Sequence, residues 1–177
     1  SVRVPFLMAW PGRIPAGSAT AELLNHYDIM PTLLDCAGVR NPRSDELPGV
    51  SFLPILDGTT TSIRDEVVAF EEYGPVRMIR TETLKYIHRY PYGPHELYDL
   101  ETDPGETTNR VDDPAYNARR RELHSRLETW FLRYADPRRD GSREPVVGTG
   151  QIDLSGIAAE GRINYWQSDR ITDVLNR

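Results

Sequence analysis

Hydrophobic positions in the first forty residues follow two different patterns. Residues 4–10 (VPFLMAW) are almost all apolar and are followed by Pro11-Gly12, which is typical of a strand buried on both faces of a parallel sheet. A helix is predicted after Asp28, a good N-cap residue, and its end is predicted at Gly38. The apolar stripe of this helix repeats at helical spacing and consists of Ile29, Met30, Leu33, Leu34 and Ala37. This part of the chain therefore predicts a strand followed by a short amphipathic helix.

Residues 39–64 are rich in proline and glycine and predict a loop, apart from a packed turn over SFLPILDG (51–58). The pattern then changes to short apolar-rich segments separated by turn residues. Four such segments are predicted to pair as an antiparallel meander, namely residues 66–73, 76–81, 84–90 and 96–100. Pro104-Gly105 is expected to form a turn that closes the meander, so that the stretch GPHELYDLETDPGE holds its edge strand.

A longer helix is predicted from the N-cap pair Asp113-Pro114 to about Tyr134. Residues 119–121 (RRR) begin its polar side, and Glu122 and Arg126 are spaced to form an ion pair on it. Its apolar stripe consists of Leu123, Leu127, Trp130, Phe131 and Tyr134. After Asp136 the pattern weakens.

These elements divide the chain into three parts: residues 1–58, 59–135 and 136–177. The first is expected to be the last strand and helix of a large α/β domain. The second is expected to be a four-stranded antiparallel sheet packed by a C-terminal helix, and the third an extension. The fold class is therefore α/β, or α+β within these 177 residues. A strand buried on both faces needs neighbouring strands, so we expect the C-terminal part of a larger protein, or partners supplied by another chain.

The amino-acid composition indicates the class of protein and makes some binding partners unfavourable. Hydrophobic residues make up 38% of the chain and the net charge is -6, which is typical of a globular domain and unfavourable for nucleic-acid binding. No apolar run approaches the ~20 residues that span a bilayer. Lys85 is the only lysine among 21 basic residues, an arginine bias that would suit a GC-rich bacterial genome. The single cysteine, Cys36, leaves the compartment open between periplasmic or secreted and cytoplasmic.

Six stretches in succession carry a family pattern: RVPFLMAWPGRIPAG, HYDIMPTLLDCAGV, LPGVSFLPILDG, RDEVVAFEEY, VRMIRTETLKYIHRY and HELYDLETDPGETTN. Their order resembles that of the type I sulfatases of the alkaline phosphatase superfamily, and the resemblance covers residues 2 to about 135. It implies a large, mostly parallel α/β domain followed by a small subdomain, in which a four-stranded antiparallel sheet is packed by a C-terminal helix. It also implies hydrolysis of a sulfate ester, on a carbohydrate or on a small aryl or alkyl group.

The family chemistry depends on a nucleophile in a Cys-x-Pro-x-Arg or Ser-x-Pro-x-Arg motif, converted to formylglycine, and on calcium. No such motif exists here, because Gly38 stands two residues after Cys36 where proline is required. Cys36 is instead expected to be a small buried helix residue. The resemblance therefore assigns no catalytic residue and no metal ligand to this chain. It implies an upstream catalytic domain in the same polypeptide, and the chain alone is expected to be inactive.

Two alternatives stay open. The chain could be a non-catalytic assembly module or truncated paralogue that forms homo-oligomers through residues 136–177, where Tyr165-Trp166 could anchor a subunit contact. Choline sulfatases, which are similar, use C-terminal extensions in this way. The chain could also belong to a phosphonate monoester or phosphodiester hydrolase, because these share the superfamily and have similar C-terminal segments.

Three histidines are the candidates for lining a substrate pocket: His95 in a loop, His88 in a strand and His26 at a helix start. For His88 and His26, sheet packing and a place in the loop beside a helix cap are the competing interpretations. The acidic residues of the 96–106 stretch lack the spacing of a calcium-binding loop and are expected to cap turns or face solvent. They are Glu96, Asp99, Glu101, Asp103 and Glu106.

Overall fold

The computed structural model describes residues 4–71 and 75–142, and its centre is a four-stranded antiparallel sheet in the order β1-β2-β3-β4. Each strand pairs with the next one along the chain, with Ile79 opposite Tyr86 in the middle of the sheet. The meander predicted from the sequence is confirmed, with its last strand at the edge of the sheet. The strands are β1 (Glu66–Phe70), β2 (Val76–Thr81), β3 (Leu84–Arg89) and β4 (Glu96–Asp99).

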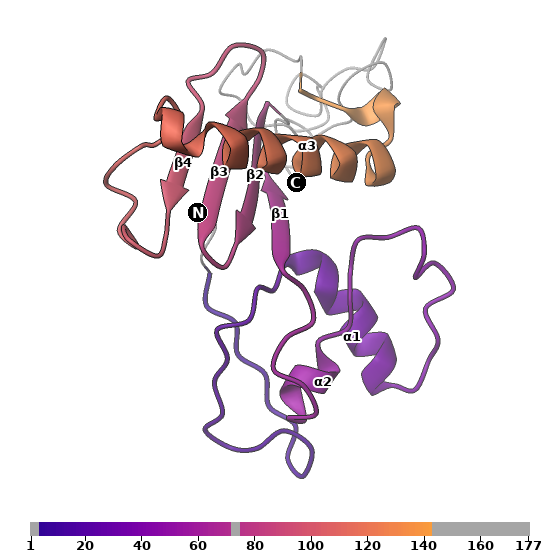
Figure 1. Cartoon of the computed structure of the whole chain (residues 1–177). Coiled ribbons are helices and arrows are strands. Elements are labelled where there is room, and N and C mark those ends of the chain that lie inside the picture. The colour runs from indigo at the N-terminus through magenta and orange to yellow at the C-terminus, as the bar shows by residue number, and fades with distance from the viewer. Residues whose placement is uncertain (1–3, 72–74, 143–177) are drawn as a thin grey trace, which may run out of the picture.

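A long helix, α3 (Asn117–Tyr134), crosses one face of this sheet (Figure 1). It follows the 3-10 turn η2 (Pro114–Tyr116), whose start is capped as predicted, because the Ala115 N–H donates to the Asp113 carboxylate at 2.9 Å. Side chains alternate along a strand, so every second residue faces the helix. The buried core between the two layers consists of Val68, Ile79, Tyr86, Leu97, Leu123, Leu127 and Phe131, with Val111 from the connecting segment.

The strand predicted over residues 4–10 is not formed. These residues have no regular secondary structure, and Phe6 and Leu7 are 50% and 94% exposed. A strand needs a neighbour to pair its backbone N–H and C=O groups, and the described part of the chain places no strand beside this segment. The prediction was therefore wrong for the structure of this chain.

The helix α1 (Ile29–Cys36) follows the 3-10 turn η1 (His26–Asp28) and is succeeded by Gly38 at φ +68°, as predicted. Its apolar stripe, however, is not its buried face. Met30 and Leu33 are 43% and 54% exposed, whereas the buried helix residues are Pro31 and Thr32. The short helix α2 (Leu53–Leu56) lies in the predicted packed turn, directly after the buried Phe52.

Polar contacts centred on Asp28 explain which face of α1 is buried. Asp28 is 0% exposed and does not cap α1 with its side chain, which corrects the prediction. Its carboxylate instead accepts the N–H groups of Asn25 at 2.7 Å and Val50 at 3.0 Å and pairs with Arg64. A Cβ at Gly49 would lie 2.0 Å from the Tyr27 carbonyl oxygen, so only glycine permits this approach of the 48–50 segment.

The same turn attaches the N-terminal part of the chain to the sheet. The Asn25 side-chain amide donates to the Val68 carbonyl at 2.8 Å, and the Val68 N–H donates to the Tyr27 hydroxyl at 3.3 Å. These side chains therefore cover part of the edge of β1, where unpaired backbone groups would otherwise invite other strands.

The chain leaves α3 through the 3-10 turn η3 (Pro137–Arg139) and returns to the sheet at Asp140, which pairs with the buried Arg77 of β2. The Arg77 guanidinium also lies 3.7 Å from the centre of the Phe131 ring. Among the described residues, no helix has the length and apolar character required to cross a membrane. Most of the predicted extension, including Tyr165-Trp166, lies outside the described residues.

Candidate functional site: a cluster of three histidines

Three of the four histidines meet beside the β3–β4 loop (residues 90–95), and we call them the histidine cluster: His88 of β3, His95 at the end of the loop and His124 of α3. The rings of His88 and His95 are stacked, with centroids 4.1 Å apart and an interplanar angle of 17°. The centroids of His88 and His124 are 4.7 Å apart. The alternation along β3 places His88 on the side of α3, so the cluster joins three elements.

Hydrogen bonds define how the rings are held. His88 Nδ1 lies 2.8 Å from the Tyr86 hydroxyl, and the Arg89 N–H donates to His95 Nδ1 at 3.2 Å. A neutral His95 that accepts at Nδ1 carries its proton at Nε2 and can donate from there. His124 Nδ1 is buried and has no hydrogen-bond partner among the described residues.

The surroundings of the cluster favour uncharged rings. Burial lowers the pKa of His88 to about 4, helped by His95, His124 and Arg77. Burial also lowers the pKa of His95, together with His124, Arg120 and Arg89, while Asp112 acts in the opposite direction. Both rings are therefore neutral near pH 7 and act there as hydrogen-bonding, stacking groups rather than as cations.

Two tyrosines border the cluster. Burial is the main cause that raises the pKa of Tyr90, followed by its hydrogen bond to Glu128. Burial likewise raises the pKa of Tyr86. Neither phenol serves as a base near neutral pH. Tyr92, at 93% exposed, extends from the β3–β4 loop and offers an aromatic ring to solvent.

The arrangement is unsuited to a metal ion. Two stacked imidazoles present their faces to each other, whereas metal ligands must direct their nitrogen lone pairs at one point. No group of three histidine, cysteine, aspartate or glutamate residues in the described chain could hold a metal ion. What the cluster can provide is a neutral N–H donor at His95, stacked on another aromatic ring.

The three histidines predicted from the sequence to line a pocket therefore lie at two separate positions in the structure. The structure brings His88 and His95 together, whereas His26 lies exposed in η1 and makes no ring contact with the other histidines. His124 was missed from the sequence, because it stands next to the apolar stripe of α3 among charged residues. Its spacing of three residues from Leu127 and seven from Phe131 was the available signal that it borders the buried face.

Of the acidic residues in the 96–106 stretch, Asp99 and Asp103 cap turns as expected. Asp99 accepts the N–H groups of Glu101 at 3.1 Å and Thr102 at 3.2 Å, and the Tyr116 hydroxyl at 2.6 Å. Asp103 caps the next turn through the Thr108 N–H at 2.8 Å. Two further carboxylates form ion pairs, between Glu106 and Lys85 and between Glu96 and Arg89.

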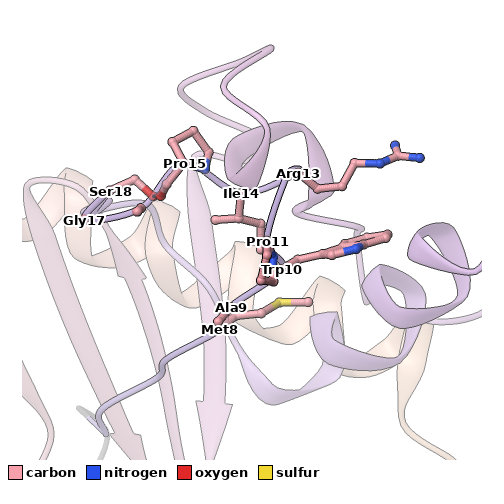
Figure 2. A pocket seen from close by; sticks show the side chains of 11 residues that line it. Met8, Ala9, Trp10, Pro11, Arg13, Ile14, Pro15, Gly17 and Ser18 are labelled. Atoms are coloured by element: carbon pink, nitrogen blue, oxygen red, sulfur yellow. Dashed lines mark hydrogen bonds between the residues drawn. The ribbon is translucent and has the colours of Figure 1, made fainter.

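A shallow pocket of about 680 Å³ lies in the loop formed by residues 8–18 (Figure 2). Its one charged side chain is Arg13, whose guanidinium lies 5.3 Å from the centre of the Trp10 ring. The loop satisfies its own polar groups, since the Arg13 and Ile14 N–H groups donate to the Trp10 carbonyl. With one cation and no base or carboxylate, this pocket has fewer chemical groups than the histidine cluster.

Cys36 also differs from its prediction. It is only half-buried, because the face of α1 that packs inward is the one that carries Pro31 and Thr32. It is a free thiol near the end of a short helix and belongs to neither candidate site.

Comparisons with known proteins agree on one family. The model of the N-sulphoglucosamine sulphohydrolase C-terminal family matches residues 1–132. A Delta 4,5-hexuronate-2-O-sulfatase of Bacteroides thetaiotaomicron is 34% identical over 142 residues, which cover 75% of this chain and 29% of that protein. The choline-sulfatase of Rhizobium meliloti is 36% identical over 120 residues, which cover 64% of this chain and 22% of that protein.

A solved structure agrees with the sequence comparisons. A protein crystallised with its substrate D-glucosamine-2-N,6-O-disulfate has a TM-score of 0.55 and 29% identity, covering 67% of this chain and 25% of that one. The chain spans only about a third or less of the length of the curated relatives it matches. Its sheet and covering helix correspond to the C-terminal region of these proteins, and the chain belongs to the N-sulphoglucosamine sulphohydrolase C-terminal family of sulfatases.

Proposed function

We propose that this chain is the C-terminal part of an enzyme that hydrolyses sulfate esters of a carbohydrate, or of a small aryl or alkyl group. The family match over residues 1–132 carries the proposal. In support, the matched relatives include sulfatases that act on sugar derivatives by name, such as the hexuronate 2-O-sulfatase and an N-acetylglucosamine-6-O-sulfatase. The arginine bias favours a bacterial source.

The role of this chain in that enzyme is structural support, together with part of the wall of the substrate pocket. Formylglycine and calcium would belong to an upstream catalytic domain of the same polypeptide, because the described residues offer no three-ligand group for a metal. The sequence also has no Cys-x-Pro-x-Arg or Ser-x-Pro-x-Arg motif. Among the described residues, the Arg64, Arg77 and Arg126 side chains are engaged in ion pairs and are therefore not free to bind a sulfate group.

The first test compares the 177-residue chain with the polypeptide encoded by the complete reading frame. We expect turnover of nitrophenyl sulfate by the longer polypeptide and none by the 177-residue chain. Turnover by the 177-residue chain would contradict the supporting role. A longer polypeptide that hydrolyses nitrophenyl phosphonate faster than nitrophenyl sulfate would favour the phosphonate hydrolase alternative, and one that hydrolyses neither would favour an assembly module.

Of the three histidines predicted to line a pocket, we propose that His95 contacts the substrate. It stands on the loop that also exposes Tyr92, and its neutral ring can donate from Nε2 to a sugar hydroxyl. His88 would act as a packing partner that holds this ring. His26, exposed and apart from the cluster, is the least suited of the three.

Substitution of His95 tests this contact in the longer polypeptide. Loss of one neutral hydrogen bond is worth about 1 kcal/mol, so His95→Ala should lower kcat/KM for a glucosamine sulfate roughly 3- to 10-fold. The same variant should leave nitrophenyl sulfate, which has no sugar hydroxyl, nearly unaffected. His26→Ala serves as the matched control and should change neither substrate. Equal losses on both substrates would indicate a structural defect instead of a sugar contact.

A further inference from the structure

The histidine cluster is the contact through which the β3–β4 loop meets α3. His95 ends the loop, stacks on His88 at 4.1 Å and accepts the Arg89 N–H at Nδ1. His88 in turn lies against His124 of α3 at 4.7 Å. A second connection runs from the Tyr90 hydroxyl to Glu128 of α3. The position of the loop on α3 therefore depends on this stack of imidazoles together with the hydrogen bond from Tyr90 to Glu128.

The charges that face this cluster are mostly positive, and two of its carboxylates already have partners. Glu128 accepts the Tyr90 hydroxyl, and Glu96 pairs with Arg89. An imidazolium formed in the cluster would therefore meet mostly cations, and Asp112 is the facing carboxylate that would favour a charged His95. The facing titratable and charged groups are Arg77 of β2, Tyr86, Arg89 and Tyr90 of β3 and its end, Arg120 and Glu128 of α3, and Asp112 before η2.

We propose that the histidine cluster is an acid-released latch, in which neutral imidazoles hold the β3–β4 loop against α3 and protonation of His88 or His95 frees the loop. Protonation of His95 at Nδ1 directly removes the acceptor for the Arg89 N–H. Protonation of His88 places a cation between two other imidazoles. The latch goes beyond the proposed function, because it operates in this chain whether or not the loop meets a substrate.

The sign of the pH effect follows from linkage. In the closed state the pKa of His88 is lowered to about 4, whereas in the released state it returns toward its ordinary value of 6.5. The released state therefore binds more protons between these two pH values, and falling pH favours it. One histidine changes the opening equilibrium by at most about tenfold per pH unit in this range, and the effect ends below pH 4.

Amide hydrogen exchange of the 177-residue chain measures this opening. The reporters are the N–H groups of Arg89 and Gly93, which bond to His95 Nδ1 and to the Arg89 carbonyl. After correction for intrinsic rates, their protection should fall by up to about 100-fold between pH 6.5 and pH 4.5. The internal reference is the Leu100 N–H, bonded to the Thr83 carbonyl at the far end of β3, and its protection should change much less.

The variant His88→Phe keeps an aromatic ring but cannot be protonated, so its Arg89 and Gly93 protection should fall at least tenfold less over the same pH range. His26→Phe, which changes an exposed histidine outside the cluster, should behave like the unaltered chain. Equal loss of protection at Leu100 and Gly93, or an unchanged pH dependence in His88→Phe, would overturn the latch. If His88→Phe does not fold, ring-proton titrations of the unaltered chain decide, because the latch requires a titration midpoint for His88 below pH 6, and a midpoint above pH 6 rejects it.

Discussion

At the scale of single residues, Asp28 holds the N-terminal part of the structure together. It is fully buried, and its carboxylate accepts the Asn25 and Val50 N–H groups and pairs with Arg64, which is itself largely buried. Removing one partner of such a pair leaves the other charge buried without compensation. We therefore expect Asp28→Ala to lower the free energy of unfolding by about 3–5 kcal/mol, measured by urea denaturation of the 177-residue chain.

The matched control for this substitution is Asp35 of α1, an exposed aspartate whose side chain accepts one hydrogen bond from the Ser51 hydroxyl at 2.7 Å. Asp35→Ala should cost no more than about 1 kcal/mol, because solvent replaces the lost bond. If the two variants were equally stable, the polar contacts of Asp28 would not be the anchor that the geometry indicates.

Sequence patterns predicted the role of a residue correctly where that role depends on its neighbours along the chain. Asp113 caps the helix start that its position before Pro114 indicates. Aspartate at position 28 is also a residue type that favours helix caps. Its carboxylate, however, accepts the Val50 N–H from a distant loop and pairs with Arg64. The pairing of His88 with His124 depends on how α3 lies across β3, and no spacing in the sequence encodes that distance. Long-range polar contacts were therefore the part that the sequence could not predict.

At the scale of elements, the meander was predictable because one face of every strand is buried by α3. Ile79 of β2 and Tyr86 of β3 lie opposite each other and belong to the core that the sheet shares with α3. Residues 4–10 are as apolar as a buried strand. Such a strand needs neighbouring strands, however, and the described part of the chain places none beside this segment. The stripe of α1 was misassigned for a related reason, since contacts of Asp28 and Thr32 determine which side of the helix is buried.

At the scale of the whole molecule, the structure has an uneven distribution of buried surface. The sheet and α3 share one core, whereas the N-terminal segment exposes large apolar side chains such as Val4, Phe6 and Leu7. Exposed apolar side chains in a row mark a surface that other protein normally covers. This distribution agrees with a family in which the matched region makes up a minor part of each relative.

This uneven burial predicts which segments of the chain are best protected from amide hydrogen exchange. Amides of residues 66–71 and 75–134 lie in or beside the shared core, so we expect their exchange to require the largest unfolding free energy. Residues 4–20 have few buried side chains and should exchange at nearly unprotected rates. Between the two, residues 25–36 should show intermediate protection, because Asn25 and Tyr27 tie them to β1. Hydrogen exchange detected by mass spectrometry resolves these three classes, and protection confined to residues 4–40 would contradict a stable unit built from the sheet and α3.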